Sequence, residues 1–172
     1  MWYNVLVGEK KRMKRINKEY ENIYKEFEEN SEFKKLSENI HHGLTRLEHV
    51  NRVARWSFFA SKVLKLDTKS VTRGALLHDF FTSEDINREN YNEFLKEHPL
   101  IALENSKKHF EINEIEEDII SKHMYPITRK KPKYKESILV SLVDKAVSCY
   151  EALRFQTATA VGITILFLYN IR

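Results

Sequence analysis

Residues 74–81 read Gly-Ala-Leu-Leu-His-Asp-Phe-Phe, an apolar run that ends in a histidine and an aspartate and resumes with two aromatic residues. A polar pair in such a run needs a partner, because an unpaired buried charge costs several kcal/mol. Neutral imidazole binds borderline divalent metal ions, and a carboxylate can bridge two of them. Adjacent helical residues point about 100° apart. His78 and Asp79 can therefore share an ion only from the edge of an inward face, and other helices must supply further ligands.

Residues of the type that could complete such a site lie elsewhere in the chain: His49, His98, His123 and Asp144. Asp144 stands in an apolar helical stretch from Ile138 to Val147. Its carboxylate is therefore either on an exposed stripe of that helix or buried and paired. Taken singly, each histidine also fits an ordinary surface or core role. Residue chemistry alone thus leaves both a metal site and a purely structural role open.

The composition favours an all-α fold in one domain. The chain has 172 residues, 42% of them hydrophobic and 31% charged, which describes an ordinary folded protein. Only four glycines and three prolines occur, and this scarcity of helix breakers favours long helices over a many-stranded sheet. We expect a single compact domain of about seven to nine helices.

Three segments follow from the hydrophobic pattern. The pattern predicts an amphipathic helical extension over residues 1–39 and an apolar C-terminal helix over residues 156–172, packed on the same domain that residues 40–155 form. The apolar run 158–169 is shorter than the roughly 20 residues that a transmembrane helix needs. A tail that contacts a membrane surface, together with the basic N-terminal helix, is the competing interpretation of these ends.

Helix starts can be placed from capping residues. A helix is expected to begin near Thr45, another at the N-cap Asp67, and a third at Asn113, where Glu116 completes a capping box. Pro99 suits the first turn of a helix that runs to Phe110.

The cysteine content indicates the compartment of the protein, and the net charge indicates its possible partners. Cys149 is the one cysteine, which rules out an intramolecular disulfide and fits a reducing compartment. The N-terminus lacks the pattern of a secretory signal, so we expect a cytoplasmic protein. A net charge of +4 permits an anionic substrate and does not require nucleic acid as a partner.

Three motifs together resemble the HD-domain superfamily of metal-dependent phosphohydrolases, over roughly residues 40–155. They are Thr45-Arg46-Leu47-Glu48-His49-Val50, Gly74-Ala75-Leu76-Leu77-His78-Asp79, and Leu142-Val143-Asp144-Lys145. Their order and spacing match the family. His98-Pro99 and Ser121-Lys122-His123 fall where a six-ligand subset of the superfamily carries two further histidines. Within that superfamily the chain resembles small HD proteins of Gram-positive bacteria and, more loosely, the dinuclear dinucleoside-polyphosphate hydrolases.

The resemblance implies the following site. A first ion would be held by His49, His78, Asp79 and Asp144, and a second by His98 and His123, with Asp79 as the bridge. One or two divalent ions per chain are implied; the ligand types suit iron, manganese, cobalt, nickel or zinc. Asp79 would act in catalysis with Arg46 and Lys145, which would grip phosphate. The resemblance also suggests a mobile basic rim around the site, formed by Lys122, Arg129, Lys130 and Lys133. The alternative is that these four side chains are simply solvated surface charges.

The expected function is hydrolysis of a phosphomonoester or phosphoanhydride of a small, nucleotide-like metabolite through metal-bound water. Phe80 to Ser83 depart from the cyclic-dinucleotide phosphodiesterase branch, and Thr82 stands where the nucleoside-monophosphatase branch has a glutamate. The general acid that would protonate the leaving group is thus unassigned. His42 is one candidate, and a purely structural role of His42 in a turn is the alternative. The alternative function is a non-catalytic metal-binding HD module that acts as a sensor or partner-binding domain. Substrate and oligomeric state are left open.

Overall fold

The fold is all-α, as the composition predicts. A computed structural model of the chain describes residues 2–38, 40–41, 44–82, 85 and 91–170. The described residues contain seven α-helices, one 3-10 turn and one short antiparallel strand pair. In chain order these elements are α1 (Trp2–Glu29), α2 (Ser31–Lys34), η1 (Lys35–Ser37), β1 (Ile40–His41), β2 (Leu44–Thr45), α3 (Arg46–Leu64), α4 (Thr68–Leu77), α5 (Tyr91–His109), α6 (Glu114–Lys122) and α7 (Lys135–Asn170).

Capping side chains start three of the helices where the sequence predicts. Thr45 and Glu48 form a capping box at the start of α3, and Asn113 and Glu116 form another at α6. The Asp67 side chain accepts a hydrogen bond from the backbone N–H of Ser70 at the start of α4. Each cap pairs N–H groups that the first helical turn leaves without a partner.

The predicted start of α5 at Pro99 is wrong. The helix begins at Tyr91, and Pro99 lies inside it. Proline has no N–H to donate to the carbonyl four residues earlier, here that of Leu95. The helix nevertheless continues on both sides, and Pro99 itself is buried. Packing of this face, which also carries the buried His98, therefore outweighs the lost hydrogen bond.

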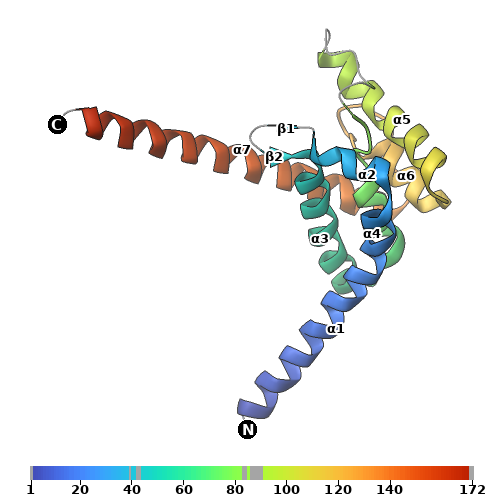
Figure 1. Cartoon of the computed structure of the whole chain (residues 1–172). Coiled ribbons are helices and arrows are strands. Elements are labelled where there is room, and N and C mark those ends of the chain that lie inside the picture. Colours follow the sequence, from blue (N-terminus) through green and yellow to red (C-terminus); the bar gives the residue numbers. More distant parts are fainter. Residues whose placement is uncertain (1, 39, 42–43, 83–84, 86–90, 171–172) are drawn as a thin grey trace.

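The core lies where α3, α4, α6 and the first half of α7 pack together, with α5 against α6 (Figure 1). Residues of the N-terminal segment also enter this core: Phe27, Phe33 and Leu36 are buried with side chains of α3 and α4. Tyr20 is also buried in this core, and Ile16 and Tyr24 pack against it, so residues 1–39 contact the rest of the domain from the middle of α1 onward.

Gly74 sets the distance between α4 and α6. A Cβ atom at this position would lie 2.7 Å from Cδ1 and 2.9 Å from Cγ2 of Ile119 on α6. No side chain fits in that space without movement, so the missing Cβ lets the two helices approach closely. Since His78 follows α4 and His123 follows α6, this contact also fixes how near those two histidines come.

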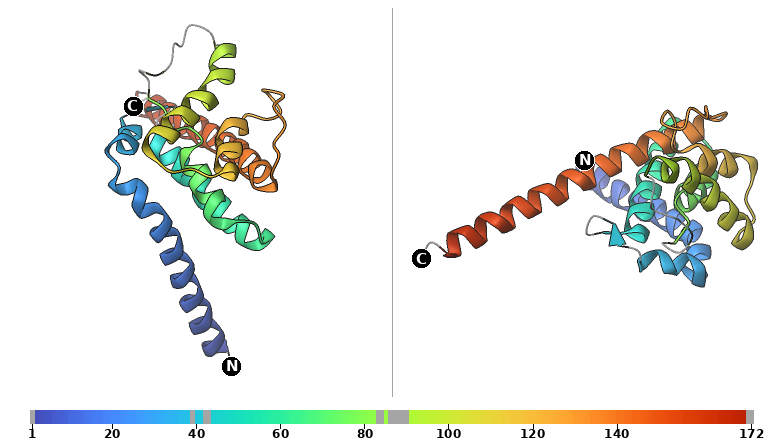
Figure 2. Two further views of the ribbon diagram at one scale, coloured as in Figure 1. Left: turned by 90° about the vertical axis from the view of Figure 1, so that its right-hand side faces the viewer. Right: turned by 90° about the horizontal axis from the view of Figure 1, so that it is seen from above.

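The two terminal helices extend beyond the core. In Figures 1 and 2 the N-terminal part of α1 and the C-terminal part of α7 project away from the other helices in different directions. Residues 156–170 were expected to form a last helix packed on the domain; instead they continue α7 and lie in its projecting part. No proline interrupts the chain between residues 135 and 170, so the sequence has no proline stop that would end the helix earlier. None of the described helices is long and apolar enough to cross a membrane.

Candidate metal centre

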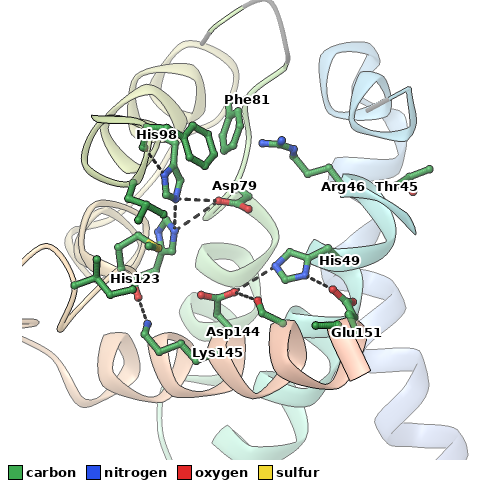
Figure 3. Close-up of a pocket in the computed structure, with 16 residues that line it drawn as sticks. Thr45, Arg46, His49, Asp79, Phe81, His98, His123, Asp144, Lys145 and Glu151 are labelled. Carbon is green, nitrogen blue, oxygen red and sulfur yellow. Dashed lines mark hydrogen bonds and ion pairs between the residues drawn. The ribbon is translucent and has the colours of Figure 1, made fainter. Parts of the chain in front are cut away.

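Five helices bring the predicted ligands to one place (Figure 3). His49 lies in the first turn of α3, His98 on α5, and Asp144 on α7. His78 and His123 occupy equivalent positions, because each is the C-cap residue of its helix, α4 and α6 respectively. The motif pair His78-Asp79 therefore lies at a helix end rather than along a helix face.

A first group consists of His49, His78 and Asp144. Nε2 of His49 lies 3.3 Å from Oδ1 of Asp144, and Nε2 of His78 lies 3.6 Å from the same oxygen. These three ligand atoms converge on one point from α3, α4 and α7, so the group could hold one metal ion.

A second group consists of Asp79, His98 and His123. Oδ1 of Asp79 is 3.6 Å from Nε2 of each of the two histidines, and the two Nε2 atoms are 3.0 Å apart. The other carboxylate oxygen of Asp79, Oδ2, lies 4.0 Å from Nε2 of His78 in the first group. Asp79 thus presents one oxygen toward each group, as the bridging role implied by the resemblance requires.

The outer nitrogen of every one of these four histidines is anchored. Nδ1 of His78 contacts the carbonyl of Ala75 at 2.7 Å, and Nδ1 of His123 contacts that of Ile120 at 2.9 Å. These carbonyls belong to the last helical turns, which leave C=O groups without partners. Nδ1 of His98 contacts the carbonyl of Phe94 at 2.8 Å. A proton held on Nδ1 leaves Nε2 as the electron-pair donor, which is the arrangement of metal-ligating histidines.

Two buried atoms test whether the site fits a metal. Nε2 of His78 and Oδ1 of Asp79 are buried and have no hydrogen-bond partner among the described residues. Leaving such atoms unpaired costs free energy, whereas both are good ligands for a borderline divalent ion. The residues present therefore fit metal ions in both groups.

The protonation states differ between the groups. Burial alone would lower the pKa of His49, but hydrogen bonds to the carboxylates of Asp144 and Glu151 raise it to about 10. In the second group, burial and the neighbouring His78 lower the pKa of His123 to about 3. Burial also lowers the pKa of His98. The second group is thus neutral at its imidazoles, whereas the first holds a proton that a metal ion must displace.

Glu151 belongs to the site although the sequence analysis missed it. Its Oε2 lies 2.8 Å from Nδ1 of His49, and its Oε1 pairs with Arg52. Glu151 is placed seven residues after Asp144, and Arg52 three residues after His49. Both spacings put the two residues on one helix face. The sequence could therefore have indicated that Glu151 lies on the same face of its helix as Asp144. It could not show which face of α7 packs against α3.

Arg46 and Lys145 have different surroundings. The Arg46 guanidinium is buried and lies 3.5 Å from the centre of the Phe81 ring, and in Figure 3 it extends toward Asp79. The Lys145 ammonium donates to the carbonyls of His123 at 2.8 Å and Ser141 at 3.1 Å, and to Oγ of Ser141 at 2.9 Å. An ammonium has three N–H donors, so these contacts use all of them and join α7 to the segment after α6.

A cavity of about 390 Å³ opens beside both groups. Its lining includes His49, Asp79, His98, His123 and Asp144, together with Arg46 and Lys145. His78 lies behind this surface and is fully buried. A ligand in the cavity can therefore reach the ligand groups of both clusters.

The expected basic rim is not part of the described cavity lining. Lys122 pairs with Asp118, and Arg129 and Lys130 are exposed. These three residues and Lys133 are absent from the lining that the structure describes. His42, the candidate general acid, lies outside the described residues.

Searches of protein-family models, of curated proteins and of solved structures find no match to this chain. The structure itself shows a helical protein with two neighbouring His/Asp groups, each of which could hold a metal ion.

Proposed function

We propose that this protein is an HD-type, metal-dependent phosphohydrolase that cleaves a phosphate ester of a small molecule. The observation that carries the proposal is the position of Asp79. Its two carboxylate oxygens face different histidine groups, at 3.6 and 4.0 Å, at the wall of an open cavity. A carboxylate in this position suits two ions held side by side, which is the arrangement of many enzymes that hydrolyse phosphate esters.

The chain's own residues divide the work as follows. Two divalent ions would lower the pKa of a water molecule and neutralise charge on the phosphate oxygens. Arg46 supplies the positive side chain that contacts phosphate, because a guanidinium matches two phosphate oxygens at once. Phe81 supports that guanidinium by stacking. Lys145 positions the His123 segment rather than binding phosphate, since its donors already contact the backbone and Ser141.

Metal content and phosphate release test this function together. Protein purified without chelators should carry near two equivalents of a divalent metal, and the loaded protein should release inorganic phosphate from members of a panel of phosphate esters. Asp79→Asn should lower both the metal content and the activity. The exposed His109, on the last turn of α5, provides the matched control, because His109→Gln should leave both unchanged.

The alternative, a non-catalytic metal-binding module, makes a different prediction in the same experiment. Such a module would bind metal through the same residues and release no phosphate from any member of the panel. Absence of metal after reconstitution would contradict both functions.

A further inference from the structure

The described lining of the cavity combines polar and apolar side chains. The polar lining comprises members of the two metal-binding groups (His49, Asp79, His98, His123 and Asp144) together with Thr45, Arg46, Lys145, Ser148 and Glu151. The remaining wall is formed by Phe81, Phe94, Leu95, Met124, Ile127 and Ala152. Phe94 and Leu95 precede His98 on α5, and Met124 and Ile127 follow His123, so the apolar wall adjoins the second metal-binding group.

The apolar wall is reached from solvent. Met124 is 9% exposed, whereas Ile127 is 56% exposed and lies at the mouth of the cavity. A cavity of this size is in the range that accommodates a small organic ligand. A ligand that extends from the metal groups toward the mouth therefore contacts apolar side chains along its way.

Positive charge in the cavity is limited. Arg46 and Lys145 are the only arginine or lysine side chains among the described lining residues, and the three donors of Lys145 contact His123 and Ser141. A chain of phosphates carries a charge that a cationic lining would have to balance, as in sites that cradle several phosphates. The described wall offers Arg46 and two ion sites, which matches a single phosphate group.

We infer that the substrate is a phosphomonoester with one phosphate and an apolar, aromatic or branched, leaving group. This inference rests on the proposed function and selects among its substrates, against sugar phosphates and nucleoside polyphosphates. In the reaction the oxygen of water forms a bond to phosphorus while the bond between phosphorus and the ester oxygen breaks. One proton of the water ends on the leaving oxygen, so the products are inorganic phosphate and an uncharged alcohol or phenol.

Binding of two phosphonates, which cannot be hydrolysed at the P–C bond by this reaction, measures the contribution of the apolar wall. Isothermal titration of the metal-loaded protein with phenylphosphonate and with methylphosphonate should give tighter binding of the phenyl compound, by about tenfold or more. In the phosphate-release assay, benzyl phosphate should likewise exceed ethyl phosphate in kcat/KM, because the two alcohols are similar leaving groups and differ mainly in apolar surface.

Ile127→Asn should reduce the preference for phenylphosphonate over methylphosphonate by severalfold, because it makes the mouth of the cavity polar. The matched control is Ile138→Asn, since Ile138 is 44% exposed on α7 and lies outside the cavity lining; it should leave the preference unchanged. The exposure of both side chains keeps the risk of unfolding low.

The failures of the two proposals are distinguishable. If both phosphonates bind the metal-loaded protein equally, and only when metal is present, the inferred leaving group is wrong while the phosphohydrolase proposal stands. An equal loss of preference in Ile127→Asn and Ile138→Asn would also overturn the inference. If neither phosphonate binds and no ester is cleaved, the proposed function fails and the inference fails with it.

Discussion

The Glu151 carboxylate lies 2.8 Å from Nδ1 of His49 and so holds the ring whose other nitrogen faces Asp144. A carboxylate behind a metal-ligating histidine orients the ring and increases its basicity. Glu151→Gln keeps the shape and removes the charge. We expect it to weaken metal binding at the first group by about 10-fold to 100-fold, measured by competition with a chelator. Glu28→Gln, an exposed change of the same type on α1, should have no effect, and an equal effect of both would contradict the assignment.

Metal binding should release protons from the first group and not from the second. The pKa of His49 is raised to about 10, so at pH 7 to 8 the ring is protonated and must lose its proton to bind a metal. Affinity at this group should therefore rise with pH up to about 10. The pKa of His123 is lowered to about 3, so its ring is already neutral. Titrations in buffers of different ionisation enthalpy count the protons; release of none at pH 7 would contradict this prediction.

Gly74→Ala should destabilise the protein although alanine favours helices. The helix preference of alanine over glycine is about 1 kcal/mol, whereas the new methyl would lie within 3.0 Å of three Ile119 atoms. Overpacking of this kind costs about 1–3 kcal/mol, so we expect a lower melting temperature. In the Ile119→Ala background, Gly74→Ala should lower the stability by less than it does in the wild-type protein. An equal loss in the two backgrounds would show that the contact with Ile119 is not the cause.

The charge of Asp118 should make the stability of the folded protein depend on pH in the acidic range. Burial raises the pKa of this carboxyl, but the Lys122 ammonium, Ser137 Oγ and the backbone N–H groups of Lys133 and Tyr134 outweigh it and lower the pKa. The stabilisation is therefore complete above the unfolded-state pKa near 4 and is lost as pH falls through the lower folded-state value.

The variant Asp118→Asn should lose about 2 kcal/mol at pH 7, and less at pH 3, in chemical unfolding. Glu38→Gln, at an exposed position, is the control for removal of a negative charge. A loss from Asp118→Asn that is equal at both pH values would contradict the role of its charge.

Lys145→Met separates a structural role from phosphate binding. Because the ammonium contacts the His123 carbonyl and Ser141, we expect a lower melting temperature and weaker metal binding at the second group. The exposed Lys130→Met serves as the control. An unchanged melting temperature and metal content with a raised KM for the phosphate ester would instead support the phosphate contact that the resemblance implies.

The sequence by itself determined the helical class, three of the helix starts and the six His and Asp residues that the structure brings together in two groups. These features depend on local chemistry: a capping side chain such as Asn113 acts within one turn, and a histidine beside an aspartate after an apolar run points to a ligand. The start of α5 was wrong because packing around the buried Pro99 outweighed its local effect on the helix.

Only the tertiary structure decided how the residues are arranged. Glu151 could not be assigned to His49, since 102 residues separate them and their contact depends on how α7 packs against α3. The acceptors that the Lys145 ammonium contacts were likewise decided by how α7 packs against the segment after α6. The division of the ligands into two groups, with Asp79 between them, follows from helix ends that meet in space, because close approach of α4 and α6 at Gly74 depends on contacts between distant parts of the chain.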